Sequence, residues 1–414
     1  MMLLKKSVSI VVACTIFLSG CATGSAGLSQ PKVGPQLSSA YEKTVVQEET
    51  PSIQKPKLDI IVPVFDPGLP DDPEDYKDAG IWPELRRAEA SRFAYQMKLA
   101  LEETGAFGAV RVMPDSSATG DLYVVGKINE SNGENVDIDI NVFDISGKEW
   151  FDKSFDHEVA ADFHNNIRNK GKDPYAPVFK QAAEKLVEEL NDHKDEQLTQ
   201  LQALTDLRFG ANFSDEAFSQ YMKVQGSKVS LVGYPDANDS MLRRVKAIRV
   251  RDQLFIDRMQ PHYEQFNQKM EASYALWQKQ SFEEVKAAQE AKSESIRKAA
   301  AGIGLIALAV LSGVSGGRSN STGGAVAGAT GAAVAGQIGM GLLGSSAKMN
   351  EESKFHRDAL IELGQSIEGE IAPQVVEHDK TTTELTGTAK EQFSQWRVFL
   401  KRMFEQEATP DVQL

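Results

Sequence analysis

The segment from Ala299 to Ala347 most constrains how this chain folds, because its composition is dominated by glycine, alanine and serine and its only charged residue is Arg318. In water each glycine inside a helix costs about 1 kcal/mol relative to alanine. Small residues nevertheless recur at every fourth position, at Gly324, Gly328, Ala332 and Gly336. That spacing places them on one helix face, where a second helix can approach closely. The segment therefore predicts a membrane contact or an oligomer.

The four-residue spacing resembles the glycine zippers of bacterial outer-membrane lipoproteins. Two charge-free runs, 299–317 and 319–347, each approach the length of about 20 residues that spans a bilayer. We expect a membrane or oligomerisation hairpin over residues 302–347, with its turn between Ser315 and Gly324. Two alternatives stay open: a flexible linker, and a zipper buried inside the protein.

The amino terminus has the layout of a secretory signal. Lys5 and Lys6 precede an uncharged, largely apolar run from Ser7 to Leu18. This run is too short to remain in a bilayer as a spanning helix, which needs about 20 residues. We expect residues 1–20 to be a signal peptide that is removed.

The next feature is the sequence Leu18-Ser19-Gly20-Cys21, which resembles the lipobox of bacterial lipoproteins. The resemblance implies cleavage between Gly20 and Cys21 and lipidation of the Cys21 thiol. The acyl chains would hold the protein on a membrane at about 0.8 kcal/mol per buried methylene. Ala22 follows, whereas an aspartate there resembles the inner-membrane retention signal of enteric bacteria. We therefore expect the periplasmic face of the outer membrane.

An α+β domain is expected over residues 57–195, after a polar, flexible tether over 21–56. Apolar runs predict strands at 60–65, 109–113, 122–128, 136–143 and 149–155. Helical spacing predicts helices from Pro83 to Thr104 and from Ala176 to Leu190. Alternating apolar and polar residues in 136–143 predict an antiparallel meander with one buried face and one wet face.

This order of strands and helices resembles the small α+β domain of the Tol-system translocation protein and of the curli-secretion lipoprotein. The run from Phe65 to Gly105, together with Met241–Arg244, resembles an uncharacterised family of proteobacterial lipoproteins. Proteins with such α+β domains assemble with other envelope proteins, so the resemblance implies interaction with envelope partners.

A long helix is expected over residues 238–301, after a connector at 196–237, because Asn238, Asp239 and Ser240 form a capping cluster before a continuous apolar stripe. Pro261 removes one backbone hydrogen bond and predicts a bend. At 1.5 Å per residue the helix would be about 95 Å long, and we expect such a length not to be buried in a compact domain.

The remaining residues, 348–414, predict a return helix and a C-terminal amphipathic helix. Thr388 and Glu391 have the spacing of a capping box for the second of these. The predicted fold class is therefore α+β, with a mixed strand and helix domain followed by a long helical hairpin.

Two enzyme motifs match by chance in our interpretation. Gly302, Gly304 and Ala307 fit a dinucleotide-binding pattern but follow a charged helix, and the required acidic residue about 20 positions later is missing. Gly313, Ser315 and Gly317 fit a nucleophile elbow, but the preceding residues do not read as a strand. We expect no catalytic residues and no cofactor.

An acidic loop supplies the weak candidates for metal binding, Asp71, Asp72, Glu74 and Asp75. Starting from Asp71, the sixth and twelfth positions are Tyr76 and Trp82, where an EF-hand needs glycine and glutamate. The six histidines are scattered without the spacing that zinc sites use. We therefore expect a solvated acidic loop and no metal.

Composition excludes two further classes of function. The chain has 45 Lys and Arg against 59 Asp and Glu, a formal charge of −14 that opposes nucleic-acid binding. Both cysteines lie within the first 21 residues, so no thiol chemistry is expected in the body of the protein. The sequence favours a non-enzymatic, oligomeric scaffold for envelope assembly or export. A ligand-binding or hydrolytic lipoprotein and a membrane-perforating lipoprotein are the alternatives.

Overall fold

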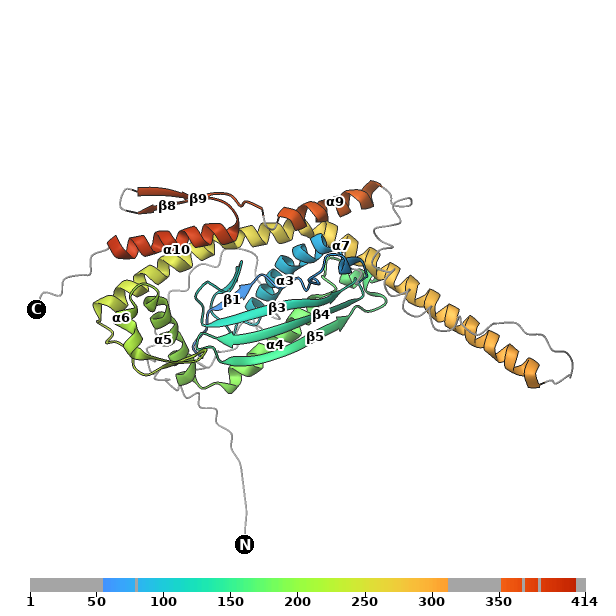
Figure 1. The fold of residues 1–414 in the computed structure, drawn as a ribbon, viewed down its shortest axis with the longest axis horizontal. Coiled ribbons are helices and arrows are strands. Elements are labelled where there is room, and N and C mark those ends of the chain that lie inside the picture. Colours follow the sequence, from blue (N-terminus) through green and yellow to red (C-terminus); the bar gives the residue numbers. More distant parts are fainter. Residues whose placement is uncertain (1–54, 79–80, 312–350, 367–368, 379–380, 407–414) are drawn as a thin grey trace, which may run out of the picture. The chain divides into compact units, whose positions relative to one another are not determined.

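A mixed five-stranded sheet organises the protein (Figure 1). The computed structural model describes residues 55–78, 81–311, 351–366, 369–378 and 381–406. The strands are β1 (Ile60–Pro63), β2 (Val110–Met113), β3 (Leu122–Ser131), β4 (Asn135–Asp144) and β5 (Glu149–Glu158). Their spatial order is β2-β1-β3-β4-β5. β1 pairs in parallel with β2 and β3, while β4 pairs antiparallel with both β3 and β5.

Both faces of this sheet are buried at β1, as its continuous apolar sequence requires, whereas β4 alternates buried with partly buried residues and β5 is mostly exposed. Ile60 and Val62 belong to one hydrophobic core, and Ile61, between them, belongs to a second core. Successive side chains of a strand point to opposite faces, so the two cores lie on opposite sides of the sheet.

The first core is formed by helices α3 (Pro83–Glu103) and α4 (Ala176–Asp192). Proline at the first position of α3 suits a helix start, because its missing N–H would have no partner there. The helix ends before Gly105, whose φ of 63° lies in the left-handed region that favours glycine.

The second core is covered by α5 (Asp195–Ala211), α6 (Asp215–Phe218) and α10 (Ala389–Gln406). Two antiparallel hairpins also contribute to it. They consist of β6 (Met222–Gln225) with β7 (Lys228–Leu231), and β8 (Gln374–His378) with β9 (Thr381–Leu385). Apart from the long helix α7, the other helical segments are α2 (Asp75–Asp78), α9 (Glu351–Ser366), and the short 3₁₀ helices η1 (Phe163–Asn165), η2 (Ile167–Asn169) and η3 (Ser219–Tyr221).

Helix α7 (Ser240–Leu311) contributes to both cores. Its buried apolar residues from Leu242 to Met259 lie in the second core, and those from Tyr263 to Phe282 lie in the first. The change falls at Pro261, and the helix continues through this residue. α7 therefore passes from one side of the sheet to the other.

This passage protects an edge of the sheet. Strand β2 is at the edge, where unpaired backbone groups can bind another strand. The Gln260 amide on α7 satisfies both outward-facing groups of Val112: Oε1 accepts from the Val112 N–H at 2.9 Å, and Nε2 donates to its carbonyl at 3.0 Å. A single side chain thus takes the place of a neighbouring strand.

The mixed α+β class is confirmed, but the structure differs from the sequence-based expectations in three places. The expectation that a helix as long as α7 stays outside a compact domain is wrong for residues 242–282, which are part of the cores. The segment 196–237 is more than a connector, because it contains α5 and the β6–β7 hairpin. The β8–β9 hairpin lies where only helices were expected.

The helix boundaries also differ from those expected. α7 ends at Leu311, later than the expected end at residue 301, and so includes the first residues of the expected hairpin. The capping box that opens α10 is confirmed: the Thr388 N–H donates to Glu391 Oε2 at 2.8 Å, and the Glu391 N–H donates to Thr388 Oγ1 at 3.2 Å. Among the described residues, no helix is both long enough and apolar enough to cross a membrane.

Candidate functional site

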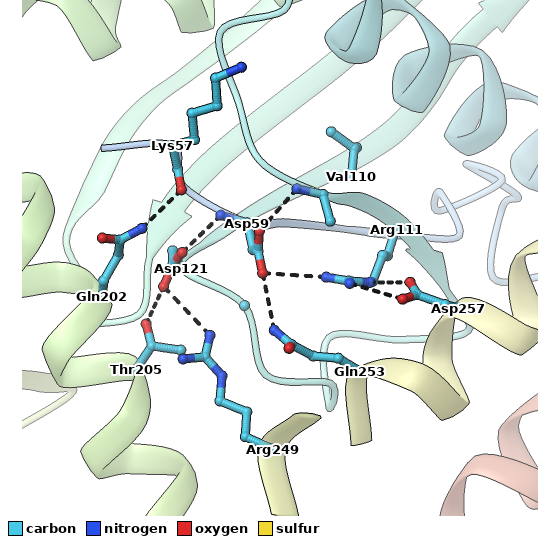
Figure 2. A network of polar contacts seen from close by, with 12 residues as sticks. Lys57, Asp59, Val110, Arg111, Asp121, Gln202, Thr205, Arg249, Gln253 and Asp257 are labelled. Carbon is cyan, nitrogen blue, oxygen red and sulfur yellow. Dashed lines mark hydrogen bonds and ion pairs between the residues drawn. The ribbon is translucent and has the colours of Figure 1, made fainter. Parts of the chain in front are cut away.

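Two polar groupings fasten α7 to the rest of the fold, and they are the candidate functional site. The first, which we name the edge network, lies where β1, β2 and β3 begin (Figure 2). It consists of Asp59, Arg111, Asp121, Thr205, Arg249, Gln253 and Asp257. The second, the core cluster, lies in the first core. It consists of Arg86, Glu89, Arg92, Ser131, Asp173, Tyr175, Asn267, Glu271 and Tyr274.

Asp59 is the centre of the edge network because it directly precedes β1. Its Oδ1 accepts from the Ala109 N–H at 3.0 Å, and its Oδ2 accepts from Gln253 Nε2 at 3.1 Å and from the Arg111 guanidinium at 3.4 Å. The Asp59 N–H donates to Asp121 Oδ2 at 2.8 Å (Figure 2). Two aspartates that precede neighbouring parallel strands are therefore joined at one edge of the sheet.

The edge network also connects the sheet to helices α5 and α7. Arg111 on β2 forms a two-pronged ion pair with Asp257 of α7, with N–O distances of 2.6 and 3.2 Å (Figure 2). Asp121 accepts from the Thr205 hydroxyl of α5 at 2.5 Å and lies 4.0 Å from the Arg249 guanidinium of α7. Burial raises the pKa of Asp121, while the Thr205 hydrogen bond and Arg249 oppose the rise. The network ties α5 and α7 to the start of the sheet.

Arg92 holds together the core cluster although its side chain is only 2% exposed. Its guanidinium lies 2.8 Å from Asp173 Oδ2 and 2.7 Å from Glu271 Oε2, and it donates to Asn267 Oδ1 at 3.0 Å. It also lies over the ring of Tyr274, 4.7 Å from the centroid, which is cation–π geometry. One cation thus joins α3, the segment before α4, and α7.

Glu89 is fully buried beside Arg92 on α3. Its Oε1 accepts from Ser131 Oγ at 2.6 Å and from the Tyr274 hydroxyl at 2.8 Å, and its Oε2 lies 3.3 Å from Arg86 Nε. Burial raises the pKa of Glu89, and Arg86, Ser131 and Tyr274 oppose that rise. The carboxyl group is engaged by α3, β3 and α7 within the core, which suits a fastening role.

Three cavities lie next to α7. One of about 230 Å³ is lined by Asp252, Phe393, Arg397 and Lys401. A second, of about 410 Å³, lies between α7, β8 and α10 and includes Arg251, Arg258 and His378. The third, of about 320 Å³, lies between α7 and the segment 163–174 that precedes α4. Pockets that enclose a drug-sized ligand measure about 300–1,000 Å³, so the first cavity is smaller than such a pocket and the other two are at the lower end of the range.

Asp252 is the carboxyl group of the first cavity. It is 5% exposed and accepts from Trp396 Nε1 of α10 at 2.8 Å. Burial raises the pKa of Asp252 to about 6, although the Trp396 hydrogen bond and the arginines 397, 249 and 111 oppose the rise. The pKa of this carboxyl group therefore lies well above the ordinary value of an aspartate.

The residues predicted from sequence fall into two groups. Gly20, Cys21 and the four zipper positions lie outside the described residues, as does the elbow motif at 313–317. The weak metal candidates Asp71, Asp72, Glu74 and Asp75 are exposed. Asp72 accepts from the Glu74 N–H at 2.9 Å. In the described part of the chain, no three or more His, Cys, Asp or Glu residues are grouped as a metal site requires.

Helix α7 contains the dinucleotide-like motif at Gly302, Gly304 and Ala307. A continuous helix lacks the strand and tight turn with which such a motif binds phosphate. Phe266, Tyr274 and Trp277, which lie on the apolar stripe of this helix, are buried in the first core.

None of the polar residues of these two groupings was singled out from the sequence. Asp59, Arg111 and Asp121 converge in the edge network, and Glu89 and Arg92 converge in the core cluster. One signal in the sequence indicates the edge network: Arg111 interrupts an apolar strand, and Asp59 directly precedes one. Their partners on α7 are more than 140 residues away along the chain, and spacing does not identify them.

Comparison with protein-family models, with curated proteins and with solved structures finds no match to this chain. The candidate function therefore depends on the sequence features and the geometry above.

Proposed function

We propose that this protein is a non-enzymatic, lipid-anchored scaffold for envelope assembly or export, on the periplasmic face of the outer membrane. In this proposal Cys21 carries the lipid. Helix α7 joins the folded body to the glycine-rich segment, which inserts into a membrane or associates with other copies of the chain. The α+β domain binds other envelope proteins.

The observation that carries the proposal is the path of α7. Its last buried residue among those whose burial is described is Phe282, and from there the helix runs unbroken to Leu311. The chain is again in contact with the body at α9, where His356 Nδ1 lies 2.9 Å from Ser273 Oγ of α7 and Leu360 is buried in the first core. The glycine-rich stretch thus lies, along the sequence, between two segments that are both fixed on the folded body.

A second support is the way α7 is held. The edge network, Gln260 and the core cluster all bind α7 to the sheet and its helices, within one compact unit. Such attachment suits a helix that connects the domain to an anchoring segment. The carboxyl groups of both polar groupings serve these internal contacts, and this use favours a structural role over an enzymatic one.

The test is fractionation of cells that produce the native chain or the Cys21→Ala variant, followed by alkaline carbonate extraction. We expect the variant to remain in the membrane fraction because the glycine-rich segment holds it there. Complete release of the variant would contradict membrane insertion. A third outcome is possible: mild salt releases neither form, but carbonate releases the variant. In that case the lipid on Cys21 is the membrane anchor, and the glycine-rich segment associates with other copies of the chain.

Oligomerisation is tested by size-exclusion chromatography with light scattering in detergent. Gly328→Leu places a large side chain on the zipper face and should reduce the mass of the assembly. Thr330→Leu is the matched control, because two helical residues add about 200° and turn that side chain away from the face. A monomeric native chain in several detergents would contradict the oligomer.

A further inference from the structure

The segment between β5 and α4 has an unusual surface for a chain of charge −14. From Phe163 to Lys172 it contains no acidic residue but three cationic residues, Arg168, Lys170 and Lys172. In the part of the chain that the structure describes, none of these three cations has a carboxylate within ion-pair distance. We name residues 163–172 the cationic loop.

An exposed apolar side chain lies in the middle of the cationic loop. Ile167 is 87% exposed, more than any other large apolar side chain among the described residues. Such exposure leaves apolar surface in water without compensation from packing. An isoleucine surrounded by cations matches the interface of an anionic bilayer, where the side chain meets acyl groups and the cations meet phosphates.

Hydrogen bonds to its own backbone define the path of the cationic loop. The Asn166 side chain accepts from the Arg168 N–H at 3.1 Å, and the Lys172 N–H donates to the Asn169 carbonyl at 3.0 Å. Gly171 allows the turn with a φ of 77°. At its start the loop is fixed to α7, because the ring of His164 lies 5.2 Å from that of Phe282.

A cavity of about 320 Å³ adjoins the loop and offers space for a phosphate headgroup. Lys170, Lys172, Asn166 and Asn169 line one side of it. Gln278 and Glu271 of α7 line the other, and Glu271 is paired with Arg92. Amide and ammonium donors are the groups that bind phosphate oxygens.

We propose that the cationic loop docks on the surface of an anionic lipid bilayer, with Ile167 inserted among the acyl chains and the cations on the phosphates. The remainder of this acidic protein is repelled by such a surface, so the contact orients the molecule as well as adding affinity. The proposal goes beyond the lipid anchor and does not require that Cys21 be lipidated.

The position of the tether is compatible with this orientation. Lys55 donates to the carbonyls of Leu190, Asn191 and His193, at the end of α4 opposite to the loop. Helix α4 has 17 residues and is therefore about 25 Å long. The tether expected from Cys21 to Lys55 has an extended reach of about 110 Å, so it can span that distance.

The experiment is co-sedimentation of the full chain carrying Cys21→Ala with vesicles of phosphatidylcholine, with and without phosphatidylglycerol. We expect stronger binding to the phosphatidylglycerol vesicles and a decline with salt. Changing Arg168, Lys170 and Lys172 to glutamine should weaken this additional binding about 100-fold, since each cation near such a surface contributes about fivefold. Ile167→Asn should weaken it about 10-fold.

The β6–β7 hairpin provides the matched controls, because it exposes Val224 at 69% and carries the exposed cations Lys223 and Lys228. Val224→Asn and the double change of the two lysines to glutamine should leave binding unchanged. Equal losses from the hairpin and loop variants would overturn the proposal, as would retained binding by the loop variants. Displacement by inorganic phosphate at constant ionic strength would assign the cavity to free phosphate and also overturn it.

The vesicle experiment distinguishes failure of the cationic-loop proposal from failure of the proposed lipid anchor and glycine zipper. Insertion of the glycine-rich segment would appear as binding to both kinds of vesicle, in the loop variants as well as in the parent chain. The cationic loop is measured by the difference between the two vesicle compositions.

Discussion

The two faces of the sheet bury charge in different ways. On the first face, Arg92 is surrounded by Asp173, Glu271 and Asn267, so that a buried cation faces opposite charges at short distance. On the second face, Asp252 accepts one hydrogen bond from a neutral donor, Trp396. Arg92 contacts α7 and Asp252 belongs to it, yet Arg92 is paired with opposite charges at short distance and Asp252 is not.

This difference shows that burial by itself does not decide the effect of a charge on stability. A paired buried charge is costly to remove, because its partners are left without compensation. A buried carboxylate with weak compensation favours its neutral form, as the raised pKa of Asp252 indicates. Removal of one buried charge should therefore have opposite effects on the two faces.

The largest effect is expected from Arg92→Met, which keeps much of the side-chain volume and removes the charge. Asp173 and Glu271 then lose their cation, and the free energy of unfolding should fall by about 3–5 kcal/mol. Urea unfolding followed by tryptophan fluorescence measures this change. Glu271→Gln is the control: because that side chain is 51% exposed, water replaces the ion pair and the loss should stay below about 1 kcal/mol. If Arg92→Met lowered the free energy of unfolding as little as Glu271→Gln does, pairing would be unimportant on this face.

Asp252→Asn should have the opposite sign at neutral pH. The pKa of Asp252 is about 6 in the folded protein and close to its ordinary value, 3.8, in the unfolded chain. A raised acidic pKa gives stability that is present below about pH 4 and is lost as the pH rises through about 6. The variant escapes this loss and retains an oxygen for Trp396, so it should be about 2–3 kcal/mol more stable than the native chain at pH 7.5.

The measurement is urea unfolding of both chains at pH 4.5 and pH 7.5. The gain should be much smaller at the lower pH, where Asp252 is largely protonated in the folded protein. A constant difference between the chains at the two pH values would contradict the assignment of the titration to Asp252.

The connection between the faces is tested by Gln260→Ala. This change leaves the N–H and carbonyl of Val112 without partners at the sheet edge, and the expected loss is about 2 kcal/mol. Hydrogen exchange should increase at the Val112 amide in particular. Gln268→Ala is the matched control on the same helix, since its exposed amide donates to Glu264 of α7 itself. Unchanged exchange at Val112 would disprove the edge-protecting role.

The smallest effect is expected from Thr388→Ala at the start of α10, which covers the second face. Loss of the capping box should cost about 1 kcal/mol, and the change in protection from hydrogen exchange should be limited to α10. Ser394→Ala, at an exposed position within the same helix, is the control. Loosening of α3 by the capping variant would show that the two faces are not independent.

The sequence predicted local structure well where that structure depends on residues close together in the chain. Pro83 and Gly105 bracket α3, and Thr388 with Glu391 starts α10, because caps and helix ends depend on neighbouring residues. The strands were recognised from their apolar runs for the same reason. The β8–β9 hairpin was missed since its threonine-rich second strand, Thr381–Leu385, offers little apolar alternation.

The candidate site was much less predictable. Arg111 is a charged residue within an apolar strand, so it predicts a partner of opposite charge. The sequence does not identify that partner as Asp257, which lies 146 residues later. Gln260 had no distinguishing signal, because a glutamine on a long helix is ordinary. Which face of α7 meets β2 depends on packing at the sheet edge, and periodicity alone does not encode it.

By itself the sequence determined the α+β class, the charge balance and most helix and strand positions, because these follow from local propensity and apolar periodicity. Tertiary structure alone decided that α7 crosses from one core to the other at Pro261, that Gln260 closes the sheet edge, and that Arg92 and Asp252 are buried with different compensation. The physical reason is that burial and pairing are properties of residues brought together from distant parts of the chain, and the free energy of a charge depends on those neighbours.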